Sequence, residues 1–264
     1  MLYLQTLPTA SVSGYLNIVL ISAGLMALLF MLWWQVGHEL REEITETRHI
    51  GTFTSLELRG SVKALVTIGP EPTLVIRGQR RSMECLLVRQ QHTSLRVANR
   101  FFLMNPTRDL LVTLTVPHLE QLHVQGASLV QLKDTRTNAE QVTVSVRGAS
   151  NVSYEGQTAT LTADLKGASR LTLAGGGQTL LARLSGASLL HANRYECLDS
   201  EVTLTGACLA RVWAQRRLAA VAGGASKVLY WGQPRLTART SGASVIVRAW
   251  RETTADEPIP VSNA

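Results

Sequence analysis

Cysteine is scarce in this chain of 264 residues, and its three cysteines lie far apart. Cys85, Cys197 and Cys208 lack paired spacing such as C-x-x-C, which argues against a disulfide framework and against a structural zinc site. No other motif of metal-binding or cofactor-binding residues stands out. We therefore expect no metal ion and no cofactor.

Clustered charge of one sign is also lacking. The formal net charge of +7 and the pI near 9.8 are compatible with nucleic acid, an anionic lipid surface or an acidic polysaccharide as partner. The arginines are nevertheless spread along the chain, and in its second half only Arg216 and Arg217 stand side by side. We expect no nucleic-acid partner.

A helical period is missing from most of the chain, and a repeat takes its place. Between positions 126 and 242 the sequence Gly-Ala-Ser occurs seven times, once with Cys in place of Ser. The intervals are 22, 19, 19, 20, 18 and 18 residues. A period near twenty that tolerates small insertions is typical of a solenoid.

The residues around each copy alternate between apolar and polar. In the first copy the even-numbered positions are Leu122, Val124, Gly126, Ser128, Val130 and Leu132, which are mostly apolar. Successive side chains of a strand point to opposite faces, so this pattern indicates strands with one buried face. About twenty residues are too few for a helical crossover, so each strand should pair in parallel with its equivalent in the next turn. The predicted fold is an all-β, single-coil parallel β-helix.

Each copy is predicted to form a corner of the solenoid. Glycine takes positive φ without steric cost, and parity places the Ser or Cys on the interior side. Turns about 4.8 Å apart are too distant for direct bonds between hydroxyls, so each hydroxyl should bond to a backbone carbonyl. The predicted structural positions are Gly126, Ser128, Gly148, Ser150, Gly167, Ser169, Gly186, Ser188, Gly206, Cys208, Gly224, Ser226, Gly242 and Ser244.

A carbohydrate-active enzyme is the alternative, because parallel β-helices also host polysaccharide lyases and hydrolases. A nucleophilic serine needs a base within hydrogen-bond reach, but no histidine accompanies the repeats at a fixed offset. Glycoside hydrolysis needs two carboxylates about 5 to 10 Å apart. The candidates recur at no common position of the repeat, and Glu196, Asp199 and Glu201 are the closest group. We assign no catalytic residue.

The first 37 residues contain no charged side chain. Residues 14–34 are mostly Leu, Ile, Val, Met and Ala, and as a helix they span roughly 32 Å, enough for a bilayer core. Tyr15 at one end and Trp33 with Trp34 at the other are placed as aromatic anchors. The basic leader and the cleavage site of a signal peptide are missing. We predict an uncleaved transmembrane helix over 14–36.

The sequence thus divides into five parts. A short N-terminal segment (1–13) precedes the transmembrane helix (14–36), and a charged juxtamembrane helix or linker (37–49) follows it. The solenoid covers 50–251, and a polar tail occupies 252–264. From 50 to 117 strand-like segments persist without an exact repeat, so we expect irregular early turns and an N-terminal cap there.

Two stretches resemble a known family. They are Phe-Thr-Ser-Leu-Glu-Leu at 53–58 and Val-Thr-Leu-Thr-Val-Pro-His-Leu-Glu-Gln-Leu-His-Val-Gln-Gly-Ala-Ser at 112–128, followed by the recurring Gly-Ala-Ser. Over about 50–251 the chain resembles the putative auto-transporter adhesin head GIN domain. The resemblance implies a right-handed parallel β-helix on the bacterial cell envelope with an adhesive role, and no catalytic residues.

We therefore expect a non-enzymatic binding, adhesion or structural module, anchored in the bacterial inner membrane, with an envelope glycan or protein as ligand. An envelope assembly or regulatory factor is a further alternative. Arg41 and Arg48 follow the helix and no Lys or Arg precedes it, which favours a cytoplasmic solenoid. The resemblance favours the periplasm, which is our expectation.

Overall fold

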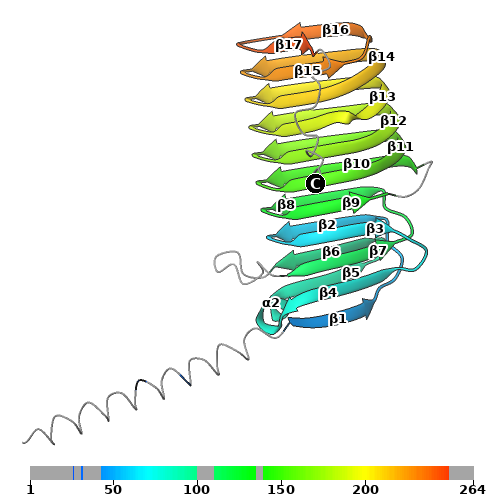
Figure 1. The fold of residues 1–264 in the computed structure, drawn as a ribbon, viewed down its shortest axis with the longest axis vertical. Coiled ribbons are helices and arrows are strands. Elements are labelled where there is room, and N and C mark those ends of the chain that lie inside the picture. The colour runs from blue at the N-terminus through cyan, green and yellow to red at the C-terminus, as the bar shows by residue number, and fades with distance from the viewer. Residues whose placement is uncertain (1–25, 27–30, 32–42, 100–109, 135–138, 250–264) are drawn as a thin grey trace, which may run out of the picture. The chain divides into compact units, whose positions relative to one another are not determined.

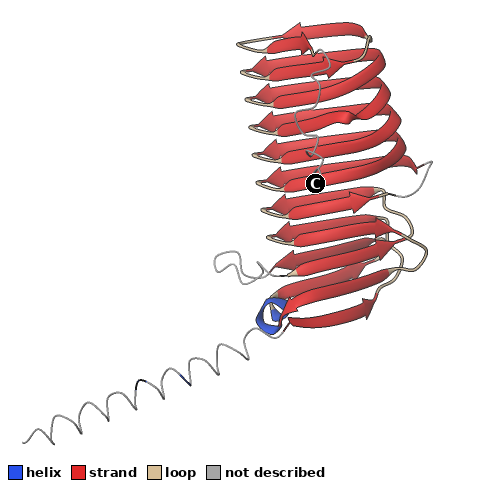
Figure 2. Cartoon of the chain, viewed as in Figure 1, coloured by secondary structure: helices blue, strands red, loops and turns tan. Residues whose placement is uncertain are grey.

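The computed structural model describes residues 26, 31, 43–99, 110–134 and 139–249. The chain divides between Glu43 and Ile44. The unit from Ile44 onward consists of strands with one short helix, α2 (Arg80–Glu84) (Figures 1 and 2). The strands are β1 (Glu43–His49), β2 (Ser55–Gly60), β3 (Lys63–Ile68), β4 (Thr73–Gln79), β5 (Leu86–Gln91), β6 (Ser94–Asn99), β7 (Leu111–Val116), β8 (Gln121–Gly126), β9 (Leu129–Lys133), β10 (Ala139–Gly148), β11 (Asn151–Gly167), β12 (Arg170–Gly186), β13 (Leu189–Gly206), β14 (Leu209–Gly224), β15 (Lys227–Trp231), β16 (Arg235–Thr240) and β17 (Val245–Arg248).

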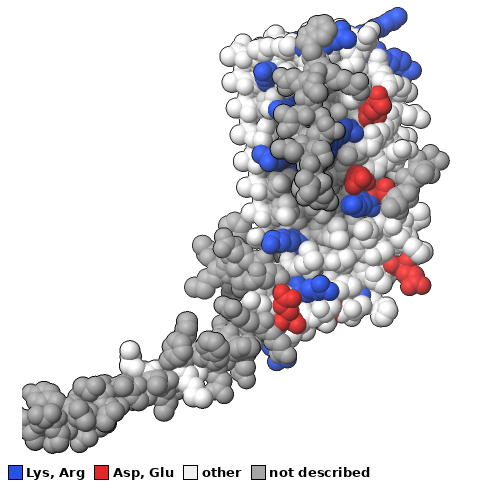
Figure 3. All heavy atoms as spheres, in the orientation of Figure 1, with Lys and Arg blue, Asp and Glu red and all other residues white. Residues whose placement is uncertain are grey.

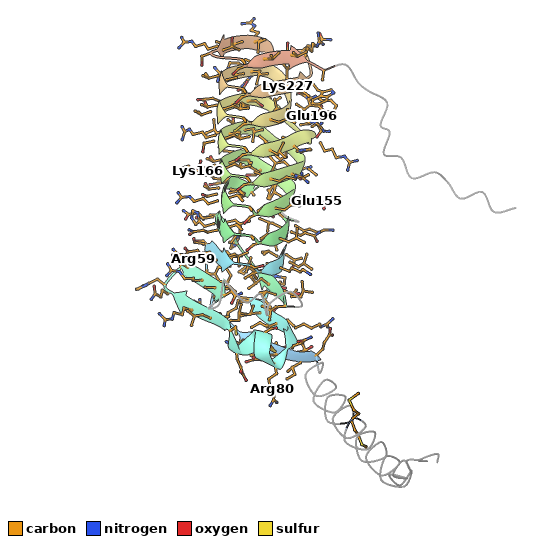
Figure 4. All side chains as sticks on the ribbon, turned by 90° about the vertical axis from the view of Figure 1, so that its left-hand side faces the viewer. Arg59, Arg80, Glu155, Lys166, Glu196 and Lys227 are labelled. Atoms are coloured by element: carbon orange, nitrogen blue, oxygen red, sulfur yellow. The ribbon has the colours of Figure 1, made fainter. Side chains whose placement is uncertain are left out.

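From β8 to β17 the strands stack in parallel, one turn on the next. Gly148 pairs with Gly126 and with Gly167, and the same register continues along the unit. The predicted all-β solenoid of parallel turns is confirmed, with about seven turns. We call the stack of strands before these glycines side A and the stack after them side B. In Figure 4, Lys166 on side A and Glu155 on side B lie at opposite sides of the unit.

The core lies between side A and side B. Inward positions hold Leu, Val and Ala, and each stacks on its equivalent in the next turn, as Leu165 does on Leu184 and Leu184 on Leu204. Burial of each such side chain contributes about 1.5–3 kcal/mol. Tyr154 and Tyr195 are the largest buried side chains, and they occupy space beside Gly156 and Gly177, where a Cβ would collide with their hydroxyls.

The first turn in the sequence lies between two later turns (Figure 1). β2 pairs with β6 on one edge and with β8 on the other, and β3 pairs likewise with β7 and β9. β4 and β5 run antiparallel to β7 and β6, and β1 pairs with β4. Early turns and a cap are both present, but their order in space is not their order in the sequence. The first turn has two edges open to pairing. The chain reverses its direction along the stack, so that β6 and β7 pair with one edge and β8 and β9 with the other.

The N-terminal segments differ from the expectation at one point. Strand β1 occupies much of 37–49, where we expected a juxtamembrane helix or linker, and its pairing with β4 supplies the backbone hydrogen bonds that a strand needs. The predicted helix over 14–36 lies outside the described residues except for Met26 and Met31, which are helical. Segments 1–13 and 252–264 lie outside them as well. Within the described ranges we find no helix with the length and apolar character to span a bilayer.

Candidate binding surface

The seven predicted glycines form one column at the corner between side A and side B. All have positive φ, from +72° to +120°. A Cβ on Gly148 would lie 2.5 Å from the carbonyl oxygen of Gly126, a distance that side chains do not tolerate. Gly60 (φ +96°) also belongs to the column, because it pairs with Gly126. The repeat pattern did not reveal Gly60, because Ser-Val rather than Ala-Ser follows it.

The predicted serines lie beside this column and are buried, apart from the half-buried Ser244. The hydroxyl of Ser150 donates to the carbonyl oxygen of Gly126 (3.0 Å) and accepts from the N–H of Ser128 (3.2 Å). The hydroxyls of Ser128, Ser169, Ser188, Ser226 and Ser244 donate in the same way to a glycine of the turn below, at 3.0–3.1 Å. The hydroxyl column thus ties each corner to its neighbour, which is a structural role.

The outward side chains of side A and side B differ in character. On side A threonines are common and opposite charges pair, as Lys166 does with Asp164 (Nζ–Oδ2 3.4 Å). On side B the outward side chains from β12 onward are mainly basic, aliphatic and aromatic, and they include one threonine, Thr172, and one acidic residue, Glu196. Figure 3 shows Lys and Arg distributed over the face in view rather than gathered in one block.

We define the side-B strip as the outward side chains of the side-B strands from β12 to β15. Register pairs join equivalent positions in successive turns, such as Leu189 with Leu209, His191 with Arg211, and Trp213 with Trp231. Every turn contributes one basic or imidazole group. The strip contains Arg170, Thr172, Leu189, His191, Leu209, Arg211, Trp213, Lys227, Leu229 and Trp231, all exposed or half-buried.

The strip has an excess of positive charge, because Arg170, Arg211 and Lys227 stand against Glu196 alone. Partial burial lowers the pKa of His191, and the charges of Arg211 and Arg170 lower it further. The Nε of Arg211 is buried and has no hydrogen-bond partner among the described residues. Glu196 pairs with Trp213 in the register, and Glu155 of the preceding turn pairs with Ala174. Both carboxylates are exposed. Partial burial of a guanidinium without an ion pair costs free energy, and an anion bound over the exposed side of Arg211 would offset this cost.

The acidic residues that we considered for catalysis are exposed or ion-paired. Arg216 donates to Asp199 (Nε–Oδ1 3.1 Å), and this hydrogen bond lowers the pKa of the carboxyl. Glu196 and Glu201 are exposed, and Glu155 lies 3.7 Å from the Nζ of Lys133. Exposed or ion-paired carboxylates lack the apolar environment that raises the pKa of a general acid.

Two adjoining depressions lie at the corner opposite the glycine column. Their volumes are about 540 and 490 Å³, and they share Ala139 and Glu140. The first also contains Gln157 and Gln178, and the second His118 and Glu120. No Lys, Arg or Trp lines them among the described residues. The strip therefore has more groups that can bind an anion or an apolar ring than these depressions have.

The described part of the chain has few groups suited to metal binding or to thiol chemistry. No group of His, Cys, Asp and Glu there is arranged to hold a metal ion. The three cysteines are free thiols, and two of them, Cys197 and Cys208, are buried. Burial raises the pKa of Cys197 to about 11, so this thiol stays protonated at neutral pH.

Comparison with known proteins places this architecture in a family. The family model described as "Putative auto-transporter adhesin, head GIN domain" matches residues 52–234, more than half of the chain. The chain belongs to this family. The resemblance noted from the sequence is therefore confirmed. No curated protein matches the sequence.

Several solved structures share the fold of this GIN domain. A putative adhesin from Bacteroides fragilis NCTC 9343 has a TM-score of 0.67 at 16% identity, covering 78% of this chain and 96% of that one. A putative lipid binding protein from Parabacteroides distasonis ATCC 8503 has a TM-score of 0.62 at 12% identity, with coverages of 79% and 97%. A putative adhesin from Parabacteroides merdae ATCC 43184 has a TM-score of 0.58 at 15% identity, with coverages of 79% and 97%. At these identities the likeness shows the shared fold alone.

Sequence reasoning missed the side-B strip of this GIN domain. Its basic residues are about twenty positions apart, so along the chain they look like scattered surface charges. The signal lies in the aligned repeats, where the second outward position after each corner reads Thr172, His191, Arg211 and Leu229.

Proposed function

We propose that this GIN domain is a non-enzymatic binding and adhesion module of the bacterial cell envelope, and that the side-B strip is its ligand-binding surface. The observation that carries the proposal is the concentration of unbalanced cations, leucines and tryptophans on one face of consecutive turns. Solenoids bind partners along such extended surfaces. Arg and Trp together with exposed apolar groups are typical of interaction sites.

The proposal includes a membrane anchor. In it, the apolar segment 14–36 holds the chain in the inner membrane and the right-handed solenoid lies in the periplasm. The uncharged N-terminal sequence and the family support this arrangement. Protease treatment of intact spheroplasts tests it: we expect cleavage of the solenoid from outside, whereas full protection would place the solenoid in the cytoplasm.

The non-enzymatic part of the proposal is supported by how the reactive groups are used. The serine hydroxyls donate to corner carbonyls, and Asp199 is held by Arg216. Incubation of the full chain with a panel of envelope polysaccharides tests this part, with new reducing ends or unsaturated products as the signal. We expect none, and a cleaved polysaccharide would overturn it.

Two leucines allow a matched test of the binding surface. Leu209 on side B and Leu181 on side A are both half-buried and point outward from adjacent turns. We expect Leu209→Glu to abolish binding of the purified full chain to isolated envelope fractions, because it places a carboxylate among the apolar groups of the strip. Leu181→Glu should leave binding intact. Equal binding by both variants would show that the strip is not the binding surface.

A further inference from the structure

We infer that the ligand of the side-B strip is an acidic polysaccharide whose carboxylates lie over the basic groups of successive turns and whose sugar rings pack on the leucines and tryptophans. This inference rests on the proposed function and names the chemical class of its ligand.

The charge of the strip calls for an anion. Arg170, Arg211 and Lys227 point outward from three different turns, against one acidic side chain, the exposed Glu196, which pairs with Trp213 in the register. Guanidinium and ammonium groups bind carboxylates through short, charge-assisted hydrogen bonds. Arg211 is half-buried and forms no ion pair with the described residues, so an anion over its exposed side stabilises a charge that the protein itself leaves uncompensated.

The spacing of the strip calls for a polymer. Turns are roughly 4.8 Å apart, so Arg170 and Lys227, three turns apart, are separated by roughly 14 Å along the stack. A single small anion contacts one or two of these groups. A chain that carries a charge on repeating units contacts all of them at once, and each additional contact adds to the same binding event.

The apolar part of the strip favours sugar over peptide. Trp213 and Trp231 are register partners in successive turns, and Leu209 and Leu229 are the register partners of Lys227 and Arg211. A sugar ring has an apolar face and a polar rim, which suits such a surface. An acidic peptide would gain most from pairing with a free strand edge, but the strip lies on the face of a sheet whose backbone groups already pair between turns.

Two double variants test the inference at equal change of net charge. Arg211→Ala/Lys227→Ala removes two charges from the strip, and Arg183→Ala/Arg239→Ala removes two exposed charges from side A. The full chain is titrated calorimetrically with polygalacturonate, with neutral dextran, with single-stranded DNA and with phosphatidylglycerol vesicles. Circular dichroism melts establish that both variants are folded.

We expect polygalacturonate to bind the parent chain, and the strip variant to bind it at least about tenfold more weakly, a loss of about 1.4 kcal/mol or more. The side-A variant should lose less than about twofold. Equal weakening in both variants would reduce the attraction to net charge and overturn the inference, and so would tighter binding of DNA or vesicles than of polygalacturonate. If polygalacturonate fails to bind while Leu209→Glu still abolishes binding to envelope fractions, the ligand class is wrong and the proposed binding surface stands.

Discussion

Replacement of Gly186 by valine tests the physical basis of the glycine column. Gly186 has a φ of +86°, and a Cβ there would lie 2.8 Å from the carbonyl oxygen of Gly167. The strained backbone costs about 1–3 kcal/mol, and the displacement of packed neighbours costs about 1–3 kcal/mol. The same carbonyl accepts hydrogen bonds from the N–H of Ala187 (2.9 Å) and the hydroxyl of Ser188 (3.1 Å), so its displacement weakens both. We expect a loss of about 3–5 kcal/mol in the free energy of unfolding.

Ser188→Ala is the matched control two residues away. The Ser188 hydroxyl donates to the carbonyl oxygens of Gly167 and Ser185, and no described group donates to it. After its removal the Gly167 carbonyl still accepts the N–H of Ala187. The loss is therefore that of one shared hydrogen bond, about 0.5–1.5 kcal/mol.

Thermal unfolding of the purified full chain, followed by circular dichroism, separates the two variants. For a domain of this size 1 kcal/mol shifts Tm by about 2–4 °C. We expect Gly186→Val to lower Tm by about 10 °C, and Ser188→Ala by about 1–6 °C. Small and equal shifts would refute the argument that positive φ and close approach of the neighbouring carbonyl make glycine necessary at this corner.

Three further predictions concern a hydroxyl, the thiols and an imidazole. Ser150→Ala should cost about 1–3 kcal/mol in urea unfolding, more than Ser188→Ala, because it leaves the N–H of Ser128 without its acceptor. In the native chain Cys85 alone should react rapidly with a thiol reagent, as counted by mass spectrometry, and three fast thiols would contradict the burial of the other two. The folded state lowers the pKa of His191, so the unfolded chain binds this proton more tightly. Stability should therefore fall as the pH drops through 6.5 and level off below the folded pKa, and urea unfolding of His191→Ala between pH 8 and 5 should lack this component.

The repeating part of the fold was predictable because each turn contacts only its neighbours. Seven copies of Gly-Ala-Ser in an apolar alternation were enough to predict parallel turns, interior serines and corner glycines at positive φ. These features depend on local geometry, namely the two-residue period of a strand and the missing Cβ of glycine. The same reasoning applies wherever the pattern recurs, and Gly60 escaped it only because the residues after it differ.

The order of the early turns and the side-B strip were decided by the tertiary structure. A turn with two free edges can be extended on either, and pairing energy alone does not tell which edge β6 and β8 will take. The strip depends on register: Arg170 and Lys227 come into line only because each intervening turn, including the irregular β13, returns the chain to the same place. Local alternation determines which side chains face outward, whereas the hydrogen-bond register between distant strands determines which of them become neighbours.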